Sequence, residues 1–338
     1  MTRIAVIGCG HWGPNHIRVF NNLPDSKVCA VADLDEQRLR RVGGMYPSVR
    51  CEQDYQRVVT DPNIDAVVIA TPTQTHYQIA RESLLAGKHV LCEKPLCEQS
   101  NHGKELVELS HASGCLLMVG HVFLFNAGIA KLKGIIDAGE LGAIQYLAAS
   151  RTNLGPIRSD VNVAYDLATH DVSIFNWLLG GEPELVSAMG ASFLQPGIED
   201  VVFISAKYPH NAVANIQASW LDPKKVRQIT IVGNRCMATW DDLQSTTPVA
   251  IYDKGVNAVQ DYGDFGEFLR LSMWDGDVRM PKVHSDEPLK CQAIEFLKYV
   301  QQGRVERSDG VFALGVVKVL EAVTASLRLN GSPVRVGS

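Results

Sequence analysis

A glycine-rich turn near the N-terminus separates a short apolar run from a helical pattern. Residues 4–7 are rich in β-branched side chains, residues 8–13 read GCGHWG, and apolar side chains then recur at helical spacing. A GxGxxG turn between a strand and a helix indicates a dinucleotide-binding unit. Gly8 permits the tight turn, Gly10 lets a pyrophosphate approach the backbone, and Gly13 lets helix and strand pack closely. His11 and Trp12 complete the turn and are candidate cofactor contacts.

Strand and helix patterns alternate through the first third of the chain. We expect strands at 4–7, 27–32, 49–51, 66–70, 89–92 and 116–119, and helices at 35–42, 75–86 and 98–112. Continuous apolar strands separated by helices predict an α/β domain with a doubly wound parallel sheet, the Rossmann arrangement. We place this domain at residues 1–122.

Polar residues follow several of these strands, where ligands of open α/β sheets bind. Asp33 ends the second strand, and its carboxylate can accept hydrogen bonds from both ribose hydroxyls while repelling a 2′-phosphate. It therefore favours NAD over NADP. Further candidate cofactor contacts at strand ends are Thr71, Thr73, His76, Glu93 and Lys94. Thr75 is expected to cap a helix instead.

The pattern changes to β after an amphipathic helix at 127–138. Apolar and polar residues alternate over 214–220, and 201–206 and 226–232 are further strand candidates, whereas 253–263 is interpreted as a loop. This predicts a second, α+β domain at 123–338 with a largely antiparallel open sheet. One face of that sheet would be solvated or would pack on another subunit.

Asp166 and His170 are four residues apart, so on a regular helix they would lie on one face, one turn apart. Alcohol oxidation needs a group that takes the hydroxyl proton, and an imidazole with a pKa near ~6.5 suits that task. We prefer His170 as this base and expect an ionisation near neutrality. Asp166 would orient the substrate or raise the basicity of His170. Lys94 would stabilise developing negative charge or act as the base itself.

In this order, the motifs resemble the Gfo/Idh/MocA (glucose–fructose oxidoreductase/inositol dehydrogenase) family. The resemblance rests on the glycine turn, Asp33, the Ala-Thr-Pro at 70–72, the Glu-Lys-Pro at 93–95 and the DxxxH pattern at 166–170. Segments 120–126, 153–162 and 219–227 resemble the branch that oxidises C3 of UDP-N-acetylglucosamine or its uronic acid. The resemblance implies an NAD-dependent oxidoreductase, a homodimer or homotetramer, and a terminal helix at about 310–328 packed near the Rossmann domain.

Three positions differ from the pattern of that branch. Phe125 stands where Tyr is usual, Tyr165 where Trp is usual, and Thr169, beside His170, where Pro is usual. Candidate contacts to the sugar, besides Lys94, Asp166 and His170, are Asn153, Asn162 and Arg158. Arg151, Lys225 and Arg227 are further candidates for a carboxylate or diphosphate, because guanidinium groups match such oxyanions.

The amino-acid composition excludes several other classes of protein. The chain has 338 residues, 46% hydrophobic and 20% charged, with a net charge of −5. These values exclude a disordered, collagen-like or coiled-coil protein, and the acidic balance argues against nucleic-acid binding. The eight cysteines form no CxxC pair and no zinc-finger spacing, so we expect free thiols in a cytoplasmic protein and no metal. We expect no signal peptide and no membrane span, since no stretch approaches ~20 apolar residues.

Three functions stay open at this level. The first is an NAD-dependent dehydrogenase acting on a nucleotide sugar. The second is a 3-keto-sugar reductase, or an inositol or free-sugar dehydrogenase, which would use the same residues. The third is a non-catalytic NAD-binding regulator, which would have no need of Lys94, Asp166 and His170 together.

Overall fold

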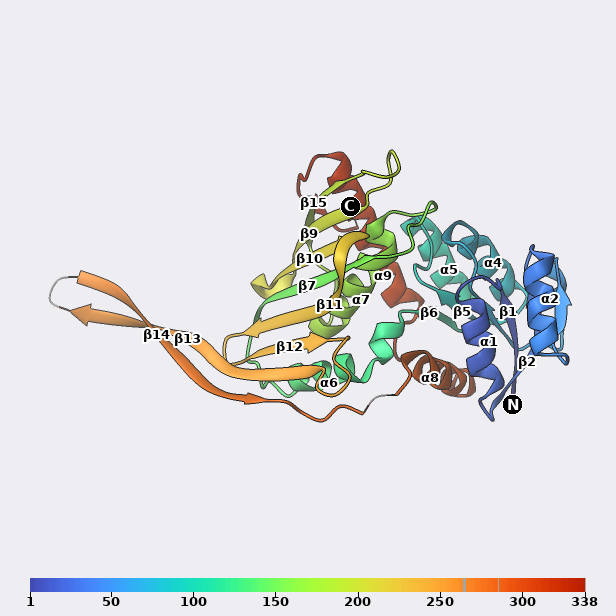
Figure 1. Cartoon of the computed structure of the whole chain (residues 1–338), viewed down its shortest axis with the longest axis horizontal. Coiled ribbons are helices and arrows are strands. Elements are labelled where there is room, and N and C mark those ends of the chain that lie inside the picture. Colours follow the sequence, from blue (N-terminus) through green and yellow to red (C-terminus); the bar gives the residue numbers. More distant parts are fainter. Residues whose placement is uncertain (264–265, 285, 338) are drawn as a thin grey trace.

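The N-terminal part of the chain is a six-stranded parallel sheet in the order β3-β2-β1-β4-β5-β6 (Figure 1). The computed structural model describes residues 1–263, 266–284 and 286–337. The elements of this part are β1 (Thr2–Ile7), α1 (Gly13–Asn21), β2 (Ser26–Ala32), α2 (Glu36–Met45), β3 (Arg50–Glu52), α3 (Gln56–Val59), β4 (Ala66–Ile69), α4 (Thr73–Leu85), β5 (His89–Glu93), α5 (Ser100–Ser113) and β6 (Leu117–Gly120). Strands β1, β4, β5 and β6 are buried almost throughout, which explains their continuous apolar sequences. The predicted doubly wound parallel sheet is confirmed.

The second sheet has nine strands in the order β14-β13-β12-β11-β7-β10-β9-β8-β15. Neighbours are antiparallel except β7 and β10, which are parallel. The elements that lead into it and build it are η1 (Val122–Phe125), α6 (Ala127–Asp137), β7 (Ile144–Leu154), η2 (Ala164–Ala168), α7 (Thr169–Leu179), β8 (Leu185–Ala191), β9 (Val201–Lys207), η3 (Pro209–Asn211), β10 (Val213–Ser219), β11 (Leu221–Gly233), β12 (Met237–Asp241) and β15 (Val334–Arg335). The predicted α+β domain with a largely antiparallel sheet is confirmed.

Strands β8, β9 and β10 of the second sheet have one buried face, as the alternation on β10 predicts. Ala214, Ile216 and Ala218 lie in the core, whereas Val213 on the other face is 47% exposed. That outer face also exposes apolar side chains of β7, β8 and β9. It is therefore available for packing on another surface.

A long hairpin extends from the end of the second sheet, away from the body of the molecule (Figure 1, orange). It consists of β13 (Val249–Gly263) and β14 (Gly266–Arg279), which pair with each other in antiparallel register. The expected loop at 253–263 is therefore wrong. The sequence of this segment shows no apolar period, and the segment is a strand through its pairing with β14.

Two C-terminal helices join the two sheets. The first, α8 (Pro288–Gln302), packs against α1 and η1, and the second, α9 (Gly310–Arg328), packs against α5, α7 and β8. Within the described residues, α9 alone is long and apolar enough to cross a membrane by length and composition. The expectation that no stretch approaches a span is corrected on this point. More than half of the helix is buried inside the chain, as in core helices that pass the same test.

Candidate active site

Packing within the chain requires two of the three fingerprint glycines. Gly8 has a φ of 96°, and a Cβ there would lie 2.5 Å from the carbonyl oxygen of Ala70. A Cβ on Gly13 would lie 1.9 Å from the carbonyl oxygen of Gly8. A Cβ on Gly10 would meet nothing closer than Arg38 Nη1, at 3.6 Å. Because packing leaves room at Gly10, this turn fits the close approach of an external group such as a dinucleotide pyrophosphate.

The carboxylate of Asp33 is fixed beside this turn. One oxygen accepts from the backbone N–H of Cys9 at 2.6 Å, and the other from that of Asp35 at 2.8 Å. Arg38 Nη1 lies 3.7 Å from the carboxylate. His11 and Trp12 are exposed in the same turn, with their rings edge to face at 5.6 Å. The chain thus presents the acid and the turn together, as a bound adenosine ribose requires.

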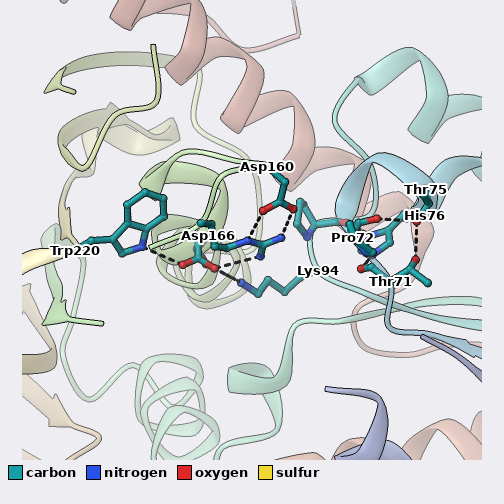
Figure 2. Close-up of polar contacts among 10 residues, drawn as sticks. Thr71, Pro72, Thr75, His76, Lys94, Asp160, Asp166 and Trp220 are labelled. Carbon is teal, nitrogen blue, oxygen red and sulfur yellow. Dashed lines mark hydrogen bonds and ion pairs between the residues drawn. The ribbon is translucent and has the colours of Figure 1, made fainter. Parts of the chain in front are cut away.

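The segment after β4 is tied to the segment after β5 by His76. This side chain is 1% exposed, and its two ring nitrogens lie 2.8 Å from the carbonyl oxygen of Pro95 and 2.9 Å from that of Thr71 (Figure 2). Thr75 does not cap α4, because its hydroxyl lies in the first turn and bonds the Thr71 hydroxyl and the Pro72 carbonyl. Thr73, the first residue of α4, is buried.

Glu93 ends β5 next to the last residue of β6, Gly120. Its carboxylate bonds Nε2 of the buried His16 at 2.7 Å and the backbone N–H of Lys94 at 3.3 Å. Although burial alone opposes the charged form, these two partners hold the pKa of Glu93 below its usual value. An anionic Glu93 is thus held at the carboxyl end of the sheet, directly before Lys94.

Lys94 connects the first sheet to the second domain. Its Nζ donates to the backbone oxygen of Asp166 at 2.6 Å and to Oδ1 of the same residue at 3.4 Å. Asp166 also accepts from Arg158 Nη1 at 3.4 Å and from Trp220 Nε1 at 3.1 Å, and Figure 2 shows Trp220 and Lys94 on opposite sides of it. Burial lowers the pKa of Lys94, and the Asp166 carboxylate opposes that effect.

Asp166 does not share a regular helix with His170. Residues 164–168 form a π-helix, and α7 begins only at Thr169. The prediction of a regular i, i+4 pair is therefore wrong. No hydrogen bond joins the two side chains among the described residues, and Asp166 faces Lys94, Arg158 and Trp220 instead. π-Helical turns occur often at functional sites because they redirect side chains in this way.

His170 lies half-buried among cations and aromatic rings. Phe123 packs edge to face on its ring at 4.9 Å, and its Nδ1 is buried without a partner in the described part of the chain. Burial and the nearby charges of Lys94 and Arg151 lower the pKa of His170 well below its ordinary value. The ionisation expected near neutrality is therefore corrected to a more acidic one, and His170 is a neutral imidazole at pH 7.

The other candidate residues differ in their surroundings. Arg151 is 2% exposed and forms a bidentate ion pair with Asp171, at 2.7 and 2.9 Å, so its guanidinium is held by a carboxylate of the chain itself. Arg227 pairs with Asp242 at 3.0 Å, and Lys225 is exposed.

Three substrate candidates lie in or next to the segment after β7. Arg158 pairs with Asp160 and stays partly exposed. Asn162 bonds Glu199 at 2.7 Å and accepts from the backbone N–H of Tyr165, which anchors the start of the π-helix. The Asn153 side chain packs against Gly155.

Sequence reasoning missed two buried contributors to this region, His16 and Trp220. Both had a signal: His16 lies three residues after Gly13 on the buried face of α1, and Trp220 follows the inward alternation of β10. Those patterns mark burial, but not the partner that each side chain meets.

Both domains of the chain match known proteins. Residues 2–121 match the family described as "Oxidoreductase family, NAD-binding Rossmann fold", and residues 129–239 match the "GFO/IDH/MocA C-terminal domain". The chain is 30% identical to UDP-N-acetylglucosamine 3-dehydrogenase of Acidithiobacillus ferrooxidans over 76% of its own length and 79% of that protein. It is also 30% identical to scyllo-inositol 2-dehydrogenase (NAD(+)) of Bacillus subtilis, over 65% of this chain and 68% of that one.

A solved structure of the Acidithiobacillus ferrooxidans UDP-N-acetylglucosamine 3-dehydrogenase superimposes with a TM-score of 0.81 and 26% identity, covering 97% of this chain and 98% of that one. The chain is an oxidoreductase acting on CH–OH groups, with NAD as its cofactor, which excludes the non-catalytic regulator. With both of its domains matched, the chain belongs to the Gfo/Idh/MocA oxidoreductase family.

Proposed function

We propose that this enzyme oxidises the C3 hydroxyl of a UDP-N-acetylhexosamine or of its uronic acid. The observation that carries the proposal is the Lys94–Asp166 pair at the carboxyl end of β5, with the neutral His170 close by and the dinucleotide cradle on the same edge of the sheet. The similarity to a UDP-N-acetylglucosamine 3-dehydrogenase supports this substrate class. Arg158 supports an acidic sugar, because part of its guanidinium stays exposed beside Asp166.

The chemistry divides between the cofactor and two side chains. When bound, NAD accepts the hydride that leaves the alcohol carbon. His170 takes the hydroxyl proton at Nε2, since its Nδ1 is buried. Lys94 uses two hydrogen bonds to hold Asp166 and donates through its remaining N–H to the substrate oxygen, where negative charge develops as the proton leaves. In the reverse direction the same groups reduce a 3-keto sugar.

Absorbance of the reduced cofactor tests the substrate class directly. NAD and purified enzyme are mixed in turn with UDP-N-acetylglucosamine, its uronic acid, myo-inositol and free glucose. We expect cofactor reduction with one of the UDP-sugars at a kcat/KM at least about tenfold above that with inositol or glucose, which corresponds to about 1.4 kcal/mol. A higher kcat/KM with inositol or glucose than with either UDP-sugar would contradict the proposal and identify an inositol or a free sugar as the substrate.

The cytoplasmic location and the homo-oligomer stay predictions from the sequence. The exposed apolar face of the second sheet supports the homo-oligomer.

A further inference from the structure

Trp220 is a fully buried side chain that reaches the candidate catalytic residues from the second sheet. It follows β10 directly, and its backbone N–H donates to the carbonyl oxygen of Asp200 at 2.9 Å. Its indole Nε1 donates to Oδ2 of Asp166 at 3.1 Å (Figure 2). Trp220 lies in the 219–227 segment that resembles the nucleotide-sugar branch, but that resemblance assigns no role to its indole.

The two oxygens of Asp166 serve different partners. Oδ2 accepts from Trp220, whereas Oδ1 lies 3.4 Å from both Lys94 Nζ and Arg158 Nη1. Arg158 is itself held by a bidentate ion pair with Asp160. Because the indole is rigid and buried, its bond fixes the rotation of the carboxylate, which keeps Oδ1 on the side of Lys94.

The charge of Lys94 depends on which groups face it. Burial and Arg158 disfavour the ammonium form, whereas the carboxylates of Asp166 and Glu93 favour it. His121, after β6, and His170, on α7, are near enough for Lys94 to lower the pKa of each, so both are neutral near pH 7. The orientation of the Asp166 carboxylate therefore affects the pKa of Lys94.

We propose that Trp220 is a positioning residue, which turns Asp166 toward Lys94 and so keeps Lys94 protonated and aimed at the substrate oxygen. This inference rests on the role of Lys94 in the proposed function. The bond from the Trp220 indole to Asp166 has a charged acceptor. Among hydrogen bonds in a buried site, those to a charged group contribute the most free energy, so the loss of this bond should have a large effect.

The test compares Trp220→Phe with the matched control Trp240→Phe. Trp240 is also buried, but its Nε1 has no hydrogen-bond partner in the described part of the chain, so that variant removes an indole without removing such a bond. Competitive acetylation with acetic anhydride at a series of pH values, read at Lys94 by mass spectrometry, gives the apparent pKa of this lysine without any turnover. We expect Trp220→Phe to lower that pKa by about one unit and Trp240→Phe to leave it unchanged.

Turnover provides a second measurement on the best substrate. In Trp220→Phe, kcat/KM at neutral pH should fall about tenfold, and the alkaline limb of its pH profile should move to lower pH. An unchanged Lys94 pKa in Trp220→Phe, or an equal change in both variants, would overturn the inference. Failure of the proposed function is a separate outcome, in which no sugar reduces NAD although the acetylation result holds. If Trp220→Phe does not fold, 3-benzothienylalanine at this position replaces the N–H by sulfur at nearly constant shape and gives the same comparison.

Discussion

Asp33 controls the choice of cofactor at the scale of a single side chain. Its carboxylate is held in place by two backbone N–H groups and repels the negative charge of a 2′-phosphate, so NAD should bind more tightly than NADP. Asp33→Ala should reduce the difference in affinity between NAD and NADP. Arg38 Nη1 lies 3.7 Å from the Asp33 carboxylate, and in the variant it would be free to pair with the 2′-phosphate of NADP.

Titration of both cofactors by fluorescence checks this prediction. The double variant Asp33→Ala/Arg38→Ala is the control and should lose the gain in NADP affinity. Equal curves for NAD and NADP on the unmodified protein would show that Asp33 does not discriminate.

The residue scale also shows the limit of sequence reasoning. The identities of Lys94, Asp166 and His170 follow from motifs, and the structure places Lys94 in contact with Asp166. The predicted pairing of Asp166 with His170 on one helical face was wrong, because a π-helix cannot be inferred from a spacing of four residues. The pKa of His170 could not be predicted either, since it depends on burial and on Arg151 and Lys94, which come from other elements.

At the scale of elements, parallel strands were the easiest to predict because burial on both faces leaves a continuous apolar run. The hairpin β13–β14 was missed because a ribbon that pairs mainly with itself carries no such signal. The glycine turn is intermediate, since its pattern predicts the turn but not which glycine serves packing and which serves the ligand.

That distinction gives a prediction for the turn between β1 and α1. Gly13→Ala should unfold or strongly destabilise the protein, because its Cβ would overlap a backbone oxygen. Gly10→Ala should keep its melting temperature within about 2 °C of wild type, because its Cβ meets no close atom, yet bind NAD at least about tenfold more weakly. Thermal melts and NAD titrations check both variants. A stable Gly13→Ala, or a Gly10→Ala with normal affinity, would contradict this assignment of roles.

At the scale of the whole molecule, the outer face of the second sheet predicts self-association. Met189 and Phe203 are cross-strand neighbours there, as are Val213 and Tyr146, and all four are exposed by 47% or more. Light scattering should give the mass of two or four chains. Phe203→Glu should shift it toward one chain, whereas Leu85→Glu, at an exposed apolar position on α4, should not. A wild-type protein that stays a single chain at micromolar concentration would exclude this interface.

Buried neutral histidines predict acid sensitivity of the entire fold. Burial lowers the pKa of His121 to about 3, against about 6.5 in the unfolded chain. Protons therefore bind the unfolded state more tightly, so stability is full above pH ~6.5 and falls as the pH drops toward ~3. Because of His121 alone, the free energy of unfolding should be about 2 kcal/mol lower at pH 5 than at pH 7. Urea unfolding at pH 5 and pH 7 checks this prediction. In His121→Asn the difference in unfolding free energy between the two pH values should be about 2 kcal/mol smaller than in wild type. An equal loss in wild type and variant would assign the acid sensitivity to other groups.

The central claim is that a neutral His170 takes the proton while Lys94 stays charged. The pH profile of kcat/KM on the best substrate, for wild type and His170→Ala, tests it most directly. We predict that the wild-type profile has no ionisation near pH 6.5, because the pKa of His170 lies well below that value. His170→Ala should be about 10²–10⁴-fold slower across the neutral range, with NAD affinity nearly unchanged. If His170→Ala instead keeps near-normal turnover and the wild-type profile rises with pH through an ionisation above neutrality, Lys94 is the base and the claim is wrong.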